Sequence, residues 1–173
     1  EGMKCILANP LFLLPPYRTP LMLAAAAAMI LHISPTPLNY FTALPGRMSL
    51  SHEKGLIVID NANSGTNVTT TMCAARYARH CARERELTLV IGQVEGDGAV
   101  CEGFSFDQIA YAIEKVQPAR VVWIGRYPES GTDPYDTLKG KVDAVCTTLE
   151  EGRTKAVQIA EKGSIVLSVK TWR

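Results

Sequence analysis

The sequence predicts an α/β fold, a Rossmann-like and mostly parallel sheet with helices on both faces. Two observations support this. Short apolar runs, among them GLIVID at 55–60 and ARVVWIG at 119–125, have the length and composition of strands that are buried on both sides. Longer segments with helical periodicity separate these runs, so strand and helix alternate as they do in stacked βαβ units.

The composition limits the possible functions. A chain of 173 residues can form one domain, or one domain and a piece of another. The formal net charge of +1 gives no reason to expect nucleic acid or a membrane surface as a partner. The five cysteines include no CxxC pair, so neither a zinc site nor a disulfide framework is expected, and a reduced, cytoplasmic location is favoured.

The first 45 residues predict a small helical segment. In order, we expect a short strand at 3–7, an irregular proline-rich stretch, a helix from Thr19 or Pro20 to about Ile33, a short helix within 34–44 and a turn at 45–48. The apolar run Leu21–Leu31 is too short for a membrane span, which needs about 20 residues.

The rest of the chain predicts the sheet and its helices. Strands are expected at 55–60, 87–92, 119–125, 143–148 and 164–172, and helices at 65–86, 105–117 and 148–163. Ser105 and Gln108 have the spacing of a capping box, and Thr147 or Thr148 caps the third of these helices. Gly163 is expected to end that helix.

The loop DNANSGTN at 60–67 is the first candidate site, because ligands of parallel sheets bind at the carboxyl ends of strands. The Asp60 carboxylate could accept both hydroxyls of a ribose, while Ser64, Thr66 and Asn67 face phosphate oxygens. In the alternative interpretation, Ser64 or Thr66 only caps the following helix and Asp60 binds loop amides.

Two basic residues are further candidates. Arg47 lies in the PGRM turn, where its guanidinium could reach a phosphate or a carboxylate, and Lys170 lies on the last strand. Each could equally be an ordinary surface residue. The chain has no GxxxxGK[ST] motif, and the Gly-rich stretch at 92–103 is interpreted as a mobile loop, not as a dinucleotide site. No metal site and no catalytic Ser-His or Cys-His set is predicted.

The order of these features resembles that of a Mur ligase, from the end of the central domain through the whole C-terminal domain. The matching positions are the Ala-rich helix with Ala24 and Ala25, the hinge pair Gly46 and Arg47, the strand-end loop at 60–65, and Lys170. On this resemblance, residues 1–45 are the end of the central ATPase domain with its hinge, and residues 46–173 are the C-terminal domain.

The resemblance implies an ATP-dependent ligase that activates a carboxylate as an acyl phosphate. ATP and Mg²⁺ would be held mainly by the central domain, over which the C-terminal domain closes. The candidate nucleotide-binding residues are then Arg47, Asp60, Asn63, Ser64 and Lys170. The other partners implied are a small-molecule substrate and the central domain of the same protein.

The departures from the usual motif indicate a branch of the family. Asn63 and Gly65 replace the usual histidine and proline of the loop, and the arginine motif that reads diaminopimelate is absent. The loop looks most like that of methanogen homologues that close the carbocyclic ring of the nickel tetrapyrrole coenzyme F430. The alternatives are an archaeal pseudomurein or other peptide ligase, and a Rossmann-like binding module without catalysis.

Overall fold

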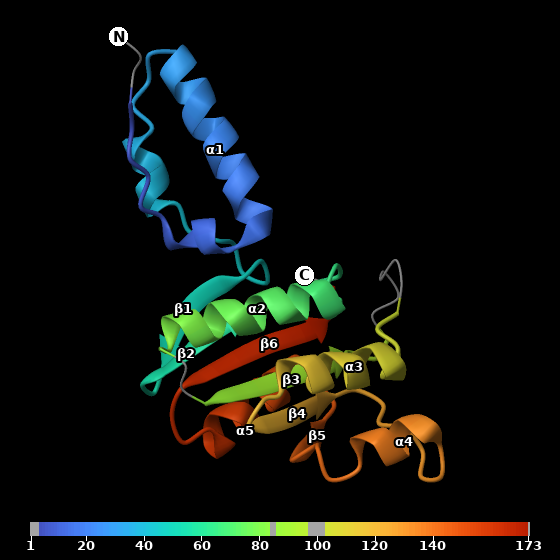
Figure 1. Cartoon of the computed structure of the whole chain (residues 1–173). Coiled ribbons are helices and arrows are strands. Elements are labelled where there is room, and N and C mark those ends of the chain that lie inside the picture. The colour runs from blue at the N-terminus through green and yellow to red at the C-terminus, as the bar shows by residue number, and fades with distance from the viewer. Residues whose placement is uncertain (1–3, 84–85, 97–102, 173) are drawn as a thin grey trace. The chain divides into compact units, whose positions relative to one another are not determined.

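The computed structural model describes residues 4–83, 86–96 and 103–172. The chain divides into two compact units, Glu1–Ala43 and Leu44–Arg173, and each is described by itself (Figure 1). This division does not assign the first unit to a larger domain. The domain boundary after residue 45 therefore stays a prediction. Residues 97–102 of the predicted mobile loop lie outside the described residues.

The first unit consists of three helical elements: the 3-10 helix η1 (Pro10–Leu13), the helix α1 (Pro15–Ile30) and the 3-10 helix η2 (Thr36–Tyr40). The Asn9 amide ties them together, because it donates to the carbonyls of Leu38 (2.7 Å) and Phe41 (2.8 Å). The predicted start of α1 at Thr19 or Pro20 was wrong, because the helix begins at Pro15. Pro15 and Pro16 are accepted in its first turn, where the backbone N–H groups have no partner within the helix. Residues 4–7 are not a strand.

The second unit is built on a six-stranded sheet with the order β1-β2-β6-β3-β4-β5. The strands are β1 (Ser49–Glu53), β2 (Leu56–Asp60), β3 (Leu87–Gln93), β4 (Arg120–Ile124), β5 (Ala144–Cys146) and β6 (Ser164–Lys170). Among the strand pairs formed by the described residues, β1–β2 is the only antiparallel one. The predicted mostly parallel sheet is therefore confirmed, and the last strand of the chain lies in its middle.

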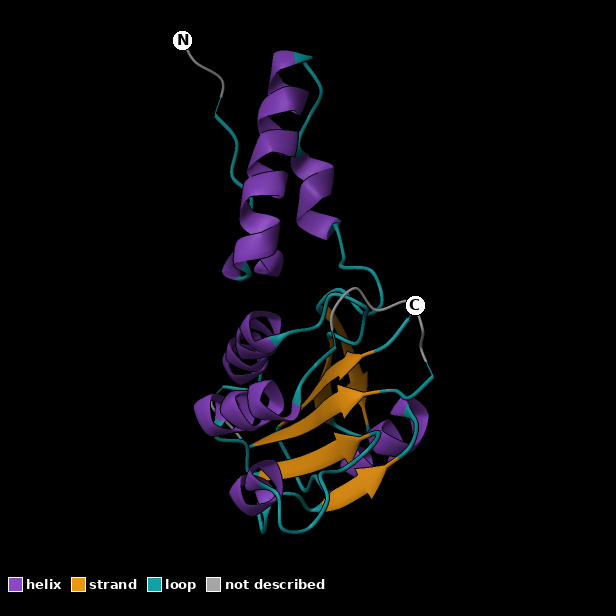
Figure 2. Ribbon diagram, turned by 90° about the vertical axis from the view of Figure 1, so that its right-hand side faces the viewer, coloured by secondary structure: helices purple, strands orange, loops and turns teal. Residues whose placement is uncertain are grey.

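Helices cover both faces of this sheet, as predicted (Figure 2). They are α2 (Val68–Cys81), α3 (Phe106–Val116), α4 (Asp133–Leu138) and α5 (Leu149–Ile159). Helices α2 and α3 lie on one face and α5 on the other. The core under α5 is made by alternate strand residues such as Val58, Val90, Ile124, Ile165 and Leu167, packed against Ala156 and Val157.

Two elements of the second unit were missed by the sequence analysis. Strand β1 forms a hairpin with β2 through Lys54 and Gly55, whose φ angles of 48° and 81° match the tight turns that suit hairpins. Most of its residues are exposed, so the strand carries little apolar signal. Helix α4 has six residues, too few for a helical period to be recognised.

The helix caps were predicted with mixed success. The capping boxes at Ser105–Gln108 and Thr148–Glu151 are present. Helix α2, however, begins later than predicted and is capped by Asn67, whose side chain accepts from the Thr70 amide, so neither Ser64 nor Thr66 is its cap. Gly163 does not end α5, which stops at Ile159. The φ of 103° at Gly163 instead lets the backbone turn into β6 beside the Glu86 carbonyl.

Helix α5 packs closely on the sheet at Gly152, and this contact predicts a stability effect. A Cβ at this position would lie 2.2 Å from Ile124 Cδ1 and 3.2 Å from Val90 Cγ1. Gly152→Leu should gain about 0.8 kcal/mol of helix propensity but lose about 1–3 kcal/mol to overpacking, so urea unfolding should show net destabilisation. Thr154→Leu, at an exposed position of the same helix, should change stability by less than about 0.5 kcal/mol. Equal stability of the two variants would contradict this close packing.

Candidate functional site

The candidate residues gather at the carboxyl edge of the sheet. Asp60 and Lys170 are the last residues of the neighbouring parallel strands β2 and β6. The chain continues past Asp60 beside β6, since the Asn61 amide donates to the Leu167 carbonyl (2.8 Å) and the Asn63 amide to the Val169 carbonyl (3.1 Å). The polar loop is thus an extension of the sheet.

The Asn63 side chain is the centre of this loop, and its residue is only 6% exposed. Its Nδ2 donates to the carbonyls of Gly46 (2.6 Å) and Asn61 (3.3 Å). Its Oδ1 accepts from the Gly65 amide (2.8 Å) and from Arg47 Nη1 (3.3 Å). An asparagine amide has two N–H donors and two acceptor lone pairs, so all four positions are occupied by protein atoms.

Thr66 fixes the same loop from inside. Its hydroxyl donates to the Asn61 carbonyl at 2.6 Å and accepts from the Asn63 amide at 3.2 Å. The residue is fully buried, so these bonds have no competition from water. The loop between β2 and α2 is therefore held in one conformation by side chains of its own.

A second set of polar residues joins the loop to α2 and β6. Asn61 Nδ2 donates to Thr70 Oγ1 (3.3 Å) and Ser168 Oγ (3.2 Å), and Ser168 Oγ also meets Thr71 Oγ1 at 2.5 Å. Sequence reasoning missed Asn61, Thr71 and Ser168. Ser168, within the apolar run SIVLSV at 164–169, was the available signal of such a polar cluster, because a buried hydroxyl needs a hydrogen-bond partner.

The PGRM turn lies directly against the loop. Gly46 has a φ of 73°, and a Cβ there would lie 2.4 Å from the Ala62 carbonyl oxygen, so the position requires glycine. Gly46 and Met48 are buried, while Arg47 between them is exposed. The turn therefore presents the Arg47 guanidinium at the surface of the loop, where Asn63 holds one of its nitrogens.

The remaining predicted residues take different positions at the edge. Asp60 is half-buried, and its Oδ1 accepts from the Ala62 amide at 3.0 Å, as the capping interpretation expected. Ser64 is half-buried on the same loop. Lys170 follows Ser168 on the α2 face of β6 by strand alternation, whereas Asp60 follows Val58 on the α5 face of β2. The structure thus brings Arg47 and Asn63 into contact but directs Asp60 and Lys170 to opposite faces.

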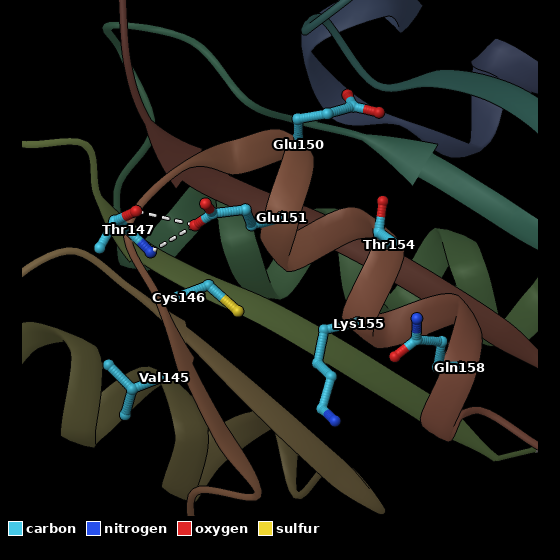
Figure 3. A pocket seen from close by; sticks show the side chains of 8 residues that line it. All are labelled: Val145, Cys146, Thr147, Glu150, Glu151, Thr154, Lys155 and Gln158. Atoms are coloured by element: carbon cyan, nitrogen blue, oxygen red, sulfur yellow. Dashed lines mark hydrogen bonds between the residues drawn. The ribbon is translucent and has the colours of Figure 1, made fainter.

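A shallow depression of about 520 Å³ lies away from this loop, between β5 and α5 (Figure 3). Within it, Glu151 accepts from the amide and hydroxyl of Thr147, bonds that lower the pKa of its carboxyl. Burial, with a smaller contribution from Glu151, raises the pKa of the Cys146 thiol, so this cysteine is a poor nucleophile at neutral pH. Glu151, with its bonds to Thr147 and Thr148, caps the start of α5.

Two other kinds of feature are absent from the part of the chain that the structure describes. Within 4–83, 86–96 and 103–172, no group of three or more His, Cys, Asp or Glu side chains is placed to hold a metal ion. No helix in these ranges has both the length and the apolar character needed to cross a membrane.

The fold is that of the C-terminal region of Mur ligases. A UDP-N-acetylmuramoylalanyl-D-glutamyl-2,6-diaminopimelate–D-alanyl-D-alanyl ligase from Acinetobacter baumannii aligns with a TM-score of 0.57 and 16% identity, over 92% of this chain and 34% of that chain. The MurF ligase from Thermotoga maritima in complex with ADP aligns with a TM-score of 0.51 and 12% identity, over 85% of this chain and 33% of that chain. The bifunctional folylpolyglutamate synthase/dihydrofolate synthase from Yersinia pestis, complexed with AMPPNP and Mn ion, aligns with a TM-score of 0.50 and 16% identity, over 85% of this chain and 35% of that chain.

Sequence comparison places the chain within this class. Residues 50–171 match the family model of the coenzyme F430 synthetase CfbE, C-terminal domain, and the chain belongs to that family. The coenzyme F(430) synthetase of Methanosarcina acetivorans is 28% identical over 167 residues, which are 91% of this chain and 34% of the relative. The chain therefore spans about a third of the length of this curated relative.

The bonding of Asn63 predicts that it stabilises the loop, unlike its neighbour Ser64. Asn63→Ala removes four hydrogen bonds and leaves the buried Gly46 carbonyl without its partner, so it should cost about 1–3 kcal/mol in urea unfolding. Ser64→Ala, on the half-buried side of the loop, should cost less than about 0.5 kcal/mol. Similar stability of the two variants would show that the amide is not the centre of the loop.

Proposed function

We propose that this chain is the C-terminal part of an ATP-dependent ligase that activates a substrate carboxylate as an acyl phosphate. The observation that carries the proposal is that Asn63 joins the turn that carries Arg47 to the loop that follows Asp60, at the carboxyl edge of the sheet. Family membership and the likeness to solved ligases, two of them bound to adenine nucleotides, support it.

Each residue of the loop has a role in this proposal. The exposed Arg47 guanidinium pairs with the phosphates of ATP, and Asp60 accepts the ribose hydroxyls. Ser64 lies near the phosphates, close to the start of α2, where the helix dipole favours negative charge. Asn63 does not bind the nucleotide itself, because its amide is fully used. It positions Arg47.

Residues 1–45 are proposed to complete a larger central domain that holds ATP and Mg²⁺. Leu21 and Ala25 on α1 are buried, yet the same segment exposes large apolar side chains on its other sides: Met22, Leu23, Ile30, Leu31 and Ile33 are each at least 58% exposed. A helix that is apolar all round is usually buried in a larger core. We expect this apolar surface to contact the rest of the central domain. That domain is also the proposed partner of the C-terminal unit.

The particular ligase is proposed to be a coenzyme F430 synthetase, in which ATP drives closure of a carbocyclic ring on a nickel tetrapyrrole. The match to that family over residues 50–171 favours this identity over a peptide ligase. A cytoplasmic location is proposed with it, since Cys5, Cys73, Cys81 and Cys146 are all free thiols, as expected in a reducing compartment.

Asp60 provides the test in the longer ligase. Asp60→Asn keeps an oxygen for the Ala62 amide but removes the charge, so the melting temperature should stay the same. The KM for ATP should rise about ten- to a hundredfold, the effect of losing one charge-assisted hydrogen bond of roughly 1.5–3 kcal/mol. Steady-state kinetics and thermal unfolding on the same sample measure both.

A matched control is Asp143→Asn, which changes a carboxylate that binds Arg120 and the Val121 amide near the start of β4. This variant should leave the KM for ATP unaltered, whatever it does to stability. An unchanged KM in Asp60→Asn as well would show that Asp60 only holds the loop.

A further inference from the structure

Gly65 is a glycine that its own backbone conformation does not require. The residue is exposed in the loop between β2 and α2, and its φ angle lies outside the left-handed region that favours glycine. Gly46, in the turn that faces this loop, differs in this respect, because its φ is 73°. A reason other than backbone strain must therefore account for the missing side chain at position 65.

The backbone around Gly65 is held on both sides. Its amide donates to Asn63 Oδ1 (2.8 Å), and its carbonyl accepts from Asn67 Nδ2 (3.2 Å). The Asn67 side chain is fixed in turn, since its Oδ1 accepts from the Thr70 amide (3.0 Å) at the start of α2. A shift of the loop that makes room for a side chain at Gly65 would therefore cost these hydrogen bonds.

The space that a side chain would fill at Gly65 borders the Arg47 guanidinium. A Cβ atom there would lie 3.1 Å from Asn63 Oδ1 and 3.9 Å from Arg47 Nη1. These two atoms contact each other, because Nη1 donates to Oδ1 (3.3 Å). Alanine would thus crowd the Asn63 oxygen, and the further atoms of a longer side chain would extend beside the guanidinium. Glycine leaves that side of the guanidinium open.

A guanidinium beside bare backbone suits a phosphate group. Arg47 is exposed, and the planar fork of its guanidinium matches two oxygens of one phosphate. Glycine is the usual residue where a backbone must approach a ligand closely. The loop continues into the N-terminus of α2, whose dipole favours negative charge, while the half-buried Asp60 carboxylate accepts from the Ala62 amide.

We propose that Gly65 is a specificity-determining residue, which admits a phosphate oxygen of ATP to Arg47 at an approach that a side chain would block. Asn63 fixes the guanidinium and Gly65 keeps it accessible, so the two residues have separate roles. Gly65 does not bind the phosphate itself, because its amide is used by Asn63. This inference rests on the proposed function and adds a steric determinant to its nucleotide site.

The test compares Gly65→Leu with Gly65→Ala in the longer ligase. Both variants place a Cβ against Asn63 Oδ1, but leucine alone has further atoms beside the guanidinium. Gly65→Leu should raise the KM for ATP about tenfold, the effect of weakening one charge-assisted hydrogen bond. Gly65→Ala, the matched control, should keep a KM close to that of the unaltered enzyme. If leucine unfolds the enzyme, the shorter Gly65→Thr gives the same comparison.

A double-mutant cycle with Arg47→Ala separates the blocking of Arg47 from other effects. Arg47→Ala alone should raise the KM for ATP about ten- to a hundredfold. Gly65→Leu should then add less than about twofold, because the contact that it blocks is already lost. Full additivity of the two changes, or an equal KM in Gly65→Leu and Gly65→Ala, would overturn the inference and leave the ligase function standing. An unchanged KM in both Arg47→Ala and Asp60→Asn would overturn the proposed function and the inference together.

Discussion

The side-chain amide of Asn63 is the interaction on which the carboxyl edge of the sheet depends. It joins three separate pieces of backbone: the turn at Gly46, the end of β2 at Asn61, and the loop before α2 at Gly65. Because both donors and both acceptors are used, any change of the amide leaves a buried group unpaired. Arg47, which belongs to the second unit, is thereby bound to the loop that follows Asp60.

This constraint explains why a buried strand runs into so many small polar residues. Gly46 must approach the Ala62 carbonyl without a side chain, and Thr66 must bind the Asn61 carbonyl inside the protein. Gly65 leaves room above the Asn63 oxygen and the Arg47 guanidinium. The small residues thus keep the backbone rigid and its surface open, which are the two properties that a ligand needs at the end of a parallel strand.

The sequence predicted the sheet better than the site. Apolar runs such as GLIVID and ARVVWIG correspond to β2 and β4, and the capping boxes at Ser105 and Thr148 mark real helix starts. The central place of β6 could not be predicted, because it depends on pairing between distant segments. The role of Asn63 was hidden for the same reason, since its shortest bond reaches Gly46, 17 residues earlier. Strand β1 was missed because only Leu50 within it is apolar.

Hydrogen exchange of the Asn63 side-chain amide, measured by NMR, tests the central claim most directly. The Asn67 side chain, exposed at the start of α2, is the internal reference. Two buried bonds should slow exchange of the Asn63 NH₂ protons at least about tenfold relative to those of Asn67, because exchange then requires the loop to open. The Gly65 amide should be slow as well. Exchange of the Asn63 amide as fast as that of Asn67 would contradict a rigid edge centred on Asn63.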